Sequence, residues 1–150
     1  MQDIFKNIPH PVVIGVSGGV DSMVLLHLAM QQIPRHVIIV AHFDHGLRGD
    51  TSDGDRIFVE NFCRENNLIF ESESQKIDEI ANSQKMSIEA AARKYRYQFF
   101  AKIYQKHNAN ALCTAHHADD CIESAIFNFI RGTKFGGLTT LKKENFWEIE

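Results

Sequence analysis

Short apolar runs alternate with longer amphipathic segments along the chain. The apolar runs predict buried strands; they cover residues 12–16, 37–43, 68–71 and 111–115. The amphipathic segments repeat apolar side chains about once per helical turn and predict helices; they cover residues 21–32, 55–66, 87–105 and 120–130. Residues 72–85 and 136–150 are ambiguous, with a short helix at 77–81 and a fifth strand near Phe146 as the expected elements.

This alternation predicts an α/β fold, an open parallel sheet with helices on both faces, because parallel strands are joined through crossover helices. Ligands of such sheets bind beyond the carboxyl ends of the strands. Polar clusters follow three of the predicted strands, and they read SGGVDS, HFDHGLR and HHADD. A fourth cluster, RGTKFGG, follows the next predicted helix. The sequence therefore predicts a binding site at one edge of the sheet.

Composition narrows the class of protein. A chain of 150 residues with 44% hydrophobic content suits one globular domain with a core. A net charge of −3 is not typical of a dedicated nucleic-acid-binding module. Three cysteines without a CxxC pair argue against a disulfide framework or a cysteine-rich metal site, and suit a reducing cytoplasm. The sequence shows no signal peptide and no run long enough to span a membrane, so no membrane partner is expected.

The SGGVDS cluster has the features of a phosphate-binding turn. Its residues are Ser17, Gly18, Gly19, Val20, Asp21 and Ser22. Glycines allow a positive φ and a close backbone approach, and the helix that follows offers free N–H groups to an anion. The turn has no lysine and is not a Walker A motif. Its aspartate would repel a polyphosphate unless Mg²⁺ bridged the two. The alternative is a tight turn capped by serine or aspartate.

The HFDHGLR cluster, residues 42–48, is placed to reach an adenosine or a second substrate. Strand alternation points His42 and Asp44 to one side and His45 to the other. Arg48 lies at the end of the same loop. The alternatives are a merely hydrophilic loop, or a metal site formed by His42, Asp44 and His45.

Two arginines share a face of the helix predicted over 87–105. Arg93 and Arg96 are three residues apart, and paired guanidinium groups are suited to phosphate or to a nucleic-acid backbone. The alternative is an exposed ion pair between Glu89 and Arg93, which would contribute little to stability.

The HHADD cluster opens the helix predicted over 120–130. Asp120 and Glu123 have the spacing of a capping box, which requires no function. A capping box does not explain His116 and Asp119 in the same turn. Adjacent acids repel each other unless a cation lies between them, so Mg²⁺·ATP or an ammonium group is an expected ligand.

The RGTKFGG cluster forms a basic, glycine-rich loop. Arg131 and Lys134 are suited to attracting a polyphosphate or RNA, and the alternative is a plain helix end at Gly132.

The first cluster resembles the SGGxDS signature of PP-loop ATP pyrophosphatases. The whole set, SGGVDS, DHGLR, EAAR-x-x-RY, HHADD-x-x-E and RG followed by GGL, resembles the tRNA(Ile)-lysidine synthases from about Val12 to Leu138. The resemblance implies the Rossmann-like PP-loop fold, also called adenine nucleotide alpha hydrolase-like. It implies ATP-dependent ligation of free L-lysine to the wobble cytidine of isoleucine tRNA with a CAU anticodon, through an adenylated cytidine, with release of pyrophosphate and AMP.

The resemblance also implies roles for individual residues. ATP would contact Ser17, Gly18, Gly19, Val20, Asp21, Ser22 and His42. Mg²⁺ would bind Asp21 and Asp120, while Asp119, Asp120 and Glu123 would bind either Mg²⁺ or the lysine ammonium. Arg93 and Arg96 would stabilise phosphate charge, and His116 would orient the lysine or accept its proton. Contacts to substrate or tRNA would come from His45, Arg48, Arg131 and Lys134.

One departure concerns length. Members of that family continue well beyond 150 residues, so we expect residues 1–150 to be an N-terminal ATP-binding catalytic domain, truncated at its C-terminal end and without the tRNA-binding domains. Such a fragment is expected to form little or no lysidine. The alternatives are a PP-loop tRNA thiolase, a small-molecule synthetase of the same superfamily, and a non-catalytic adenine-nucleotide sensor. The oligomeric state stays open, with a homodimer as one alternative.

Overall fold

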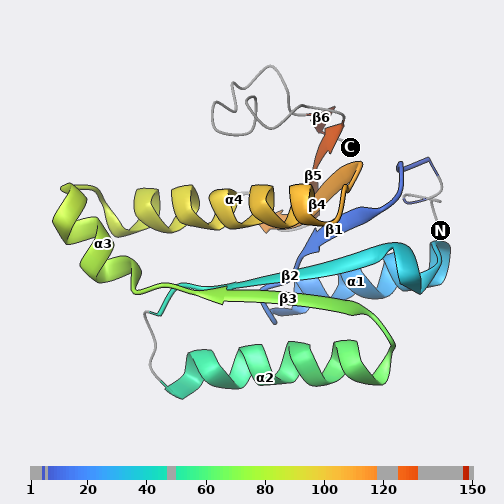
Figure 1. Ribbon diagram of the computed structural model, residues 1–150, viewed down its shortest axis with the longest axis horizontal. Coiled ribbons are helices and arrows are strands. Elements are labelled where there is room, and N and C mark those ends of the chain that lie inside the picture. The colour runs from blue at the N-terminus through green and yellow to red at the C-terminus, as the bar shows by residue number, and fades with distance from the viewer. Residues whose placement is uncertain (1–4, 6, 47–49, 118–124, 132–146, 149–150) are drawn as a thin grey trace.

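The molecule is built around a six-stranded sheet flanked by helices (Figure 1). This computed structural model describes residues 5, 7–46, 50–117, 125–131 and 147–148, and of residues 50–53, 116–117, 125–131 and 147–148 the backbone alone. In chain order the elements are β1 (Val12–Gly15), α1 (Val20–Gln32), the 3₁₀ helix η1 (Arg35–Val37), β2 (Ile38–Asp44), α2 (Asp50–Glu65), β3 (Ile69–Ser74), α3 (Ile77–Gln84), α4 (Ile88–Lys106), β4 (Ala111–His117), β5 (Ala125–Arg131) and β6 (Trp147–Glu148).

The strand order is β3-β2-β1-β4-β5-β6, and the first four strands are parallel. β1 lies at the centre of the parallel part, where Val12 is in register with Ile38 of β2 and with Ala111 of β4. After β1 the chain adds β2 and β3 on one side and then β4 on the other, and this change of side leaves a crevice at the carboxyl ends of the parallel strands. The α/β fold and its parallel sheet are therefore confirmed.

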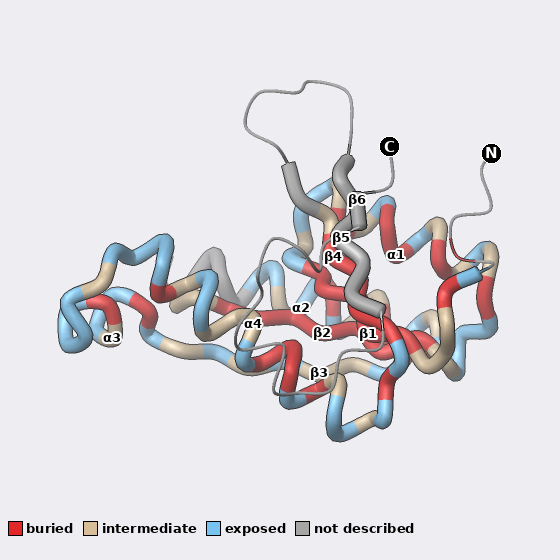
Figure 2. The backbone as a smooth tube through the Cα atoms, turned by 90° about the horizontal axis from the view of Figure 1, so that it is seen from above, coloured by how far each residue is buried: buried red, intermediate tan, exposed pale blue. Residues whose placement is uncertain are grey.

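The residues of the central strands alternate between two hydrophobic cores. Val12 and Ile14 face a core completed by α1 and α2, while Val13 faces a core completed by α3 and α4. Figure 2 shows β1 and β2 buried along their length, with exposed residues on the outer turns of the helices. Burial on both faces explains why these strands are uniformly apolar in the sequence.

The helix predicted over residues 120–130 is wrong for the part that the structure describes. Ala125–Arg131 form β5, which runs antiparallel to β4 and pairs Arg131 with Ala111. The run AIFNFIR is rich in aromatic and β-branched residues, which favour strands, and so short a run has no decisive period. β6 lies next to Phe146, where a fifth strand was expected, and pairs antiparallel with β5.

Ion pairs hold α4 over the edge strand β3. Lys102 Nζ lies 2.8 Å from Glu73 Oε2, and Lys106 Nζ lies 2.7 Å from Glu71 Oε1. The His107 imidazole shares the Glu71 oxygen at 2.7 Å. These contacts fix the helix that carries Arg93 and Arg96 relative to the sheet. Among the described residues, no helix is long and apolar enough to cross a membrane.

Candidate functional site

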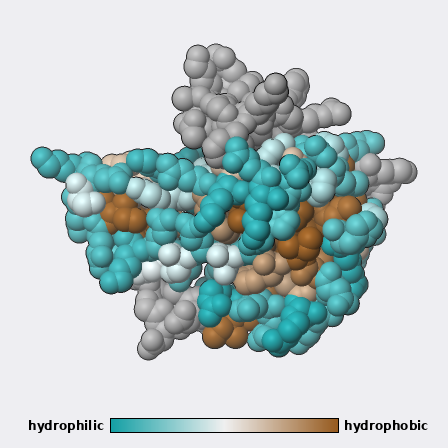
Figure 3. Space-filling model, viewed as in Figure 1, coloured by the Kyte–Doolittle hydropathy of each residue, from teal (hydrophilic) through white to brown (hydrophobic). Residues whose placement is uncertain are grey.

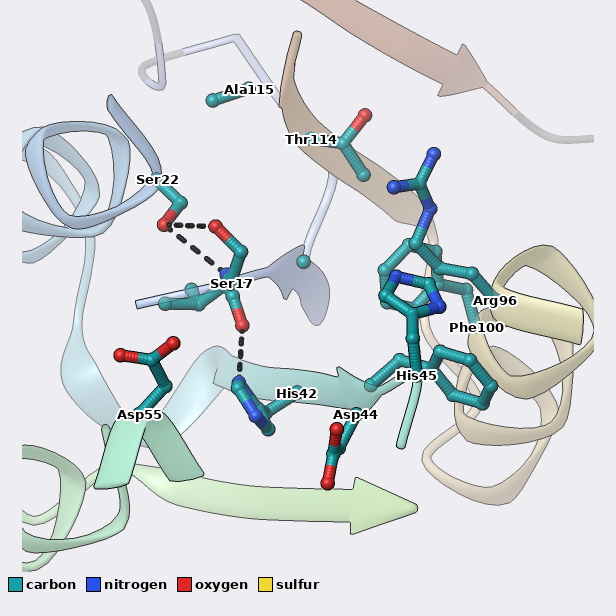
Figure 4. A pocket seen from close by; sticks show the side chains of 13 residues that line it. Ser17, Ser22, His42, Asp44, His45, Asp55, Arg96, Phe100, Thr114 and Ala115 are labelled. Atoms are coloured by element: carbon teal, nitrogen blue, oxygen red, sulfur yellow. Dashed lines mark hydrogen bonds between the residues drawn. The ribbon is translucent and has the colours of Figure 1, made fainter. Parts of the chain in front are cut away.

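A cavity of about 330 Å³ opens at the carboxyl ends of β1, β2 and β4, the edge that the sequence predicts (Figure 4). We call it the edge cavity. Its volume lies within the range of small-molecule sites. The lining residues come from five parts of the chain: Gly15, Val16, Ser17, Ser22, His42, Phe43, Asp44, His45, Asp55, Arg96, Phe100, Thr114 and Ala115.

The glycine loop, residues 17–19, joins β1 to α1 and is held by serine hydroxyls. The Ser17 N–H donates to Ser22 Oγ at 3.2 Å, and Ser22 Oγ donates to the Gly19 carbonyl at 2.8 Å. The Gly19 N–H lies 3.3 Å from Ser17 Oγ. No side chain caps the first turn of α1. A preformed turn at an uncapped helix start is suited to binding an anion.

Only one of the two glycines has a backbone conformation that side chains rarely adopt. Gly18 has φ +92°, and a Cβ there would lie 3.3 Å from the Cβ of Asp55. Gly19 has φ −71° and ψ 159°, which any residue adopts. Gly18 therefore uses the positive φ that glycine permits and Gly19 does not; the nearest side-chain atom to a Cβ at Gly19 would be Ser17 Oγ at 3.4 Å.

His42 connects β2 to the end of β1. Its Nδ1 lies 2.9 Å from the Val16 carbonyl oxygen, so Nδ1 carries the proton and donates it. Burial lowers the pKa of His42, although the Val16 carbonyl and the nearby Asp44 and Asp55 act in the opposite direction. The neutral ring therefore keeps an unprotonated Nε2, which is a hydrogen-bond acceptor.

Asp44 is buried and builds the turn after β2. Its Oδ1 accepts from the Gly46 N–H at 2.9 Å, and its Oδ2 accepts from Ser74 Oγ at 3.0 Å. Figure 4 shows His42 and Asp44 on one side of β2 and His45 on the other, as alternation predicts. Among the described residues, no three His, Cys, Asp or Glu side chains come together as metal ligands. The metal-site alternative for this loop is therefore not supported.

Helix α4 brings one of its two arginines to the cavity. Arg96 lines the edge cavity, whereas Arg93 is exposed and does not. Both guanidinium groups lie over the Tyr97 ring, with Cζ atoms 5.4 Å (Arg93) and 5.7 Å (Arg96) from its centroid. The predicted shared face is confirmed, and the alternative ion pair between Glu89 and Arg93 does not form.

Apart from Gly19, which lines neither the edge cavity nor the groove named next, the other predicted site residues form two groups. Gly18 and Val20 face a separate groove, and Asp21 is half-buried in the first turn of α1 without lining the edge cavity. The remainder lie where the structure describes only the backbone or nothing. His116 and Arg131 have described backbones in β4 and β5, and the others lie outside the described residues: Arg48, Asp119, Asp120, Glu123 and Lys134.

Sequence reasoning missed Asp55, which lies beside the glycine loop. It comes from α2, which begins at Asp50 rather than at residue 55 as expected. An acid near the start of a helix is usually explained by the helix dipole, so nothing in the local pattern marks Asp55 as a site residue. The carboxylate places negative charge next to the proposed phosphate site, on the side of the cavity opposite Arg96 (Figure 4).

A shallow apolar groove lies between α1 and α2. Its lining includes Val20, Met23, Val24, Phe58 and Phe62. Val20 is 78% exposed and Phe58 52% exposed. Figure 3 shows apolar surface at the level of α1 and α2, on a face that is otherwise mainly hydrophilic.

Comparison with known proteins gives the family. The model of the PP-loop domain matches residues 1–149. The tRNA(Ile)-lysidine synthases of Bacillus subtilis and Clostridium tetani are 39% and 38% identical to this chain, over 87% of it and 28% of their own length. That of Chlorobaculum tepidum is 37% identical over 87% of this chain and 40% of its own. The chain thus spans less than half the length of these curated relatives.

Solved structures share the fold. The U34-tRNA thiolase NcsA from Methanococcus maripaludis, with its [4Fe-4S] cluster, is 26% identical, with a TM-score of 0.60 over 80% of this chain and 42% of that one. The NH3-dependent NAD synthetase from Campylobacter jejuni is 16% identical, with a TM-score of 0.56 over 72% of this chain and 48% of that one. With a family model that matches nearly its whole length and a glycine loop at the edge of a parallel sheet, the chain belongs to the PP-loop domain family.

Proposed function

We propose that the chain is the ATP-binding catalytic part of a tRNA(Ile)-lysidine synthase. The observation that carries this proposal is the meeting of Ser17 of the glycine loop with Arg96 and two histidines, His42 of β2 and His45 just after it, around one cavity. The names of the relatives support tRNA modification as the reaction class. The cytoplasm is the expected location of such an enzyme.

The proposed reaction begins with ATP bound across the carboxyl ends of β1 and β2. The backbone N–H groups of the glycine loop and the Ser22 hydroxyl would bind the phosphates, and His42 Nε2 would accept a hydrogen bond from the nucleoside. The wobble cytidine O2 attacks the α-phosphorus and pyrophosphate leaves. The lysine amine then attacks C2 and expels AMP. Positioning and charge neutralisation are the protein's main contributions to both steps.

Mg²⁺ is expected to neutralise the phosphates when bound. In proteins it is commonly held by one or two carboxylates together with substrate phosphates. Asp21 in α1 fits that role because it lies in the first turn after the glycine loop. Asp120 is the proposed second ligand, from the resemblance to the family.

The lysine would bind near the turn after β4. Asp119, Asp120 and Glu123 are the proposed partners of its ammonium group, and His116 is proposed to orient it or accept its proton. These roles rest on the HHADD-x-x-E motif. The tRNA is proposed to contact Arg48, Arg131 and Lys134, together with parts of the relatives that have no counterpart in this chain.

A tRNA thiolase is the second candidate, because NcsA shares the fold at 26% identity. The described cysteines do not favour it. Burial raises the pKa of both Cys63 and Cys113 to about 12, so neither is a ready thiolate for sulfur transfer. A non-catalytic nucleotide sensor is the third candidate, and it would bind ATP without releasing pyrophosphate.

One assay separates the three candidates. The full-length protein is incubated with Mg²⁺·ATP, L-lysine and unmodified tRNA(Ile), and pyrophosphate release and the mass of the wobble nucleoside are measured. We expect tRNA-dependent pyrophosphate release and a nucleoside heavier by one lysine residue, both abolished by Asp120→Asn. Incorporation of sulfur would favour the thiolase, and nucleotide binding without turnover would favour the sensor.

A further inference from the structure

The α4 side of the edge cavity carries a cation, Arg96, that has no anionic partner in the part of the chain that the structure describes. Arg96 is half-buried and makes no ion pair with a carboxylate among the described residues. Burial lowers the pKa of its guanidinium, as does the neighbouring Arg93, but an arginine stays charged. A partly desolvated charge without a counter-ion is costly, and an anionic ligand in the cavity would reduce that cost.

His45 stands next to this cation as a second donor. Its Nδ1 is buried and has no hydrogen-bond partner among the described residues. A buried N–H without an acceptor is rarer and more costly than an unused lone pair, so Nδ1 is the unprotonated nitrogen. The neutral ring then carries its proton on Nε2. His45 is therefore a neutral N–H donor, the reverse of His42, whose Nδ1 carries the proton.

Burial and the nearby Arg96 keep His45 neutral. Burial lowers its pKa, Arg96 of α4 and His42 of β2 lower it further, and Asp44 of β2 acts in the opposite direction. The Phe43 ring packs edge-on against the imidazole, with centroids 5.0 Å apart, and helps to hold its orientation. Figure 4 shows the imidazole beside the guanidinium of Arg96, across the cavity from Ser17 and Ser22.

Two donors without an acceptor are suited to an oxygen that bears negative charge and unsuited to an ammonium group. We propose that His45 Nε2–H and Arg96 form a two-donor site for the phosphoryl group that is transferred, opposite the glycine loop, which would hold the phosphates that leave. The inference rests on the proposed function and adds His45 to its catalytic residues. The comparable use of a neutral imidazole to stabilise an oxyanion is known in other enzymes.

The step that this site would stabilise is the adenylation. A bond forms between the acceptor oxygen and the α-phosphorus, and the bond from the α-phosphorus to the α,β-bridging oxygen breaks. The electron pair of that bond leaves with pyrophosphate. The two non-bridging oxygens of the α-phosphate keep their negative charge throughout, and they accept hydrogen bonds from His45 and Arg96. His45 neither gains nor loses a proton.

Two substitutions of His45 test the position of the donor. His45→Gln places an amide N–H near the position of Nε2, whereas His45→Asn places one near the buried Nδ1. In the full-length protein we expect His45→Gln to retain tRNA-dependent pyrophosphate release within a few-fold. We expect His45→Asn and His45→Ala to lower kcat about 100-fold, the usual effect of losing one oxyanion donor. His36→Gln, at an exposed histidine, is the matched control and should be neutral.

The pH profile separates a donor from a base. If His45 accepted a proton, the wild-type rate would fall on the acid side and His45→Gln would be as inactive as His45→Ala; that result would overturn the proposal. Unchanged rates in His45→Asn and His45→Ala would overturn it as well.

Binding of an RNA stem-loop without nucleotide tests whether the two-donor site holds a phosphate of the RNA backbone instead of the α-phosphate of ATP. A loss of RNA affinity in His45→Ala with an unchanged kcat would assign the site to the RNA backbone and contradict our choice.

The failure of this inference can be distinguished from the failure of the proposed function. If the wild type releases no pyrophosphate, the proposed function fails, and AMP then serves as the probe. The two-donor site still predicts that AMP binds equally to the wild type and His45→Gln, and about tenfold more weakly to His45→Ala, the effect of one hydrogen bond to a charged group. Equal affinity for all three proteins would refute the site itself.

Discussion

The Nδ1 of His42 lies 2.9 Å from the carbonyl oxygen of Val16 and joins the ends of two neighbouring parallel strands. Val16 also donates its N–H to the Ala41 carbonyl at 2.9 Å, so the backbone just before the glycine loop is held from both sides. His42 therefore has two functions that substitutions can separate: Nδ1 holds the loop, and Nε2 is available to a ligand.

His42→Leu should destabilise the protein by about 1–3 kcal/mol, because the Val16 carbonyl would be buried without a donor. His42→Asn places an amide N–H near the position of Nδ1, so its stability should stay close to that of the wild type. Its affinity for ATP should nevertheless fall, because the acceptor at Nε2 is gone. Urea unfolding and calorimetric titration with ATP measure the two effects. Equal stability of the two variants would contradict the role of Nδ1.

Gly18→Ala should weaken ATP binding and lower stability by about 1 kcal/mol or more, because φ is +92° and the new Cβ would lie 3.3 Å from the Cβ of Asp55. Gly54→Ala is the matched control. A Cβ at that helical position meets nothing within 4 Å, so this change should stabilise the protein by about 0.5–1 kcal/mol. Thermal unfolding of both variants checks the pair, and a stabilising Gly18→Ala would contradict the loop geometry.

Gly15→Ala should be more disruptive still. Its Cβ would lie 2.7 Å from Phe100 Cζ and 2.9 Å from Thr114 Cγ2, inside a packed core. Overpacking of this kind costs about 1–3 kcal/mol. A second substitution, Phe100→Leu, removes the ring and should recover part of the loss. The double variant should therefore be more stable than the sum of the two single losses predicts. If it is not, the close contact with Phe100 is not the cause of the Gly15→Ala loss.

Part of the fold and of the site around these residues could be predicted from the sequence alone. The apolar runs predicted the strands because β1 and β2 are buried on both faces, and SGGVDS predicted the turn because Gly18 requires a positive φ. Asp55 was missed because its place beside Gly18 depends on how α2 packs, and no local pattern encodes that packing. The sequence predicts a helix over residues 120–130, whereas Ala125–Arg131 form a strand, because the strand is stabilised by antiparallel pairing with β4 and the spacing of apolar residues in so short a run does not reveal that pairing.

Stability should fall when the pH drops below about 6.5. The pKa values of His42 and His45 are lowered from the usual 6.5, so the unfolded chain takes up protons before the folded one does. The free energy of unfolding is therefore steady above about pH 6.5 and decreases as the pH falls from there to the lowered folded-state pKa values. Urea midpoints at about pH 7.5 and about pH 5.5 measure the loss. A double variant with His42→Asn and His45→Gln should lose less stability than the wild type between these two pH values.

A further loss is expected below about pH 4.5. Hydrogen bonds from Lys106 and His107 outweigh the burial that would raise the pKa of Glu71, and the hydrogen bond from Lys102 lowers the pKa of Glu73. Both carboxylates stabilise the folded state above their ordinary pKa of 4.5, and this stability is lost as the pH falls through their lowered values. Lys102→Gln should reduce this second loss, and an unchanged acid transition would contradict the assigned ion pair.

The central claim is that the glycine loop binds the phosphates of ATP. Backbone amide resonances followed by NMR while Mg²⁺·ATP is added test it most directly. We predict the largest shifts at the amides of Ser17, Gly18, Gly19 and Ser22, with smaller ones at His42 and His45, and their loss in Gly18→Ala. Saturable shifts confined to the apolar groove around Val24 and Phe58, or none at the glycine loop, would contradict the account.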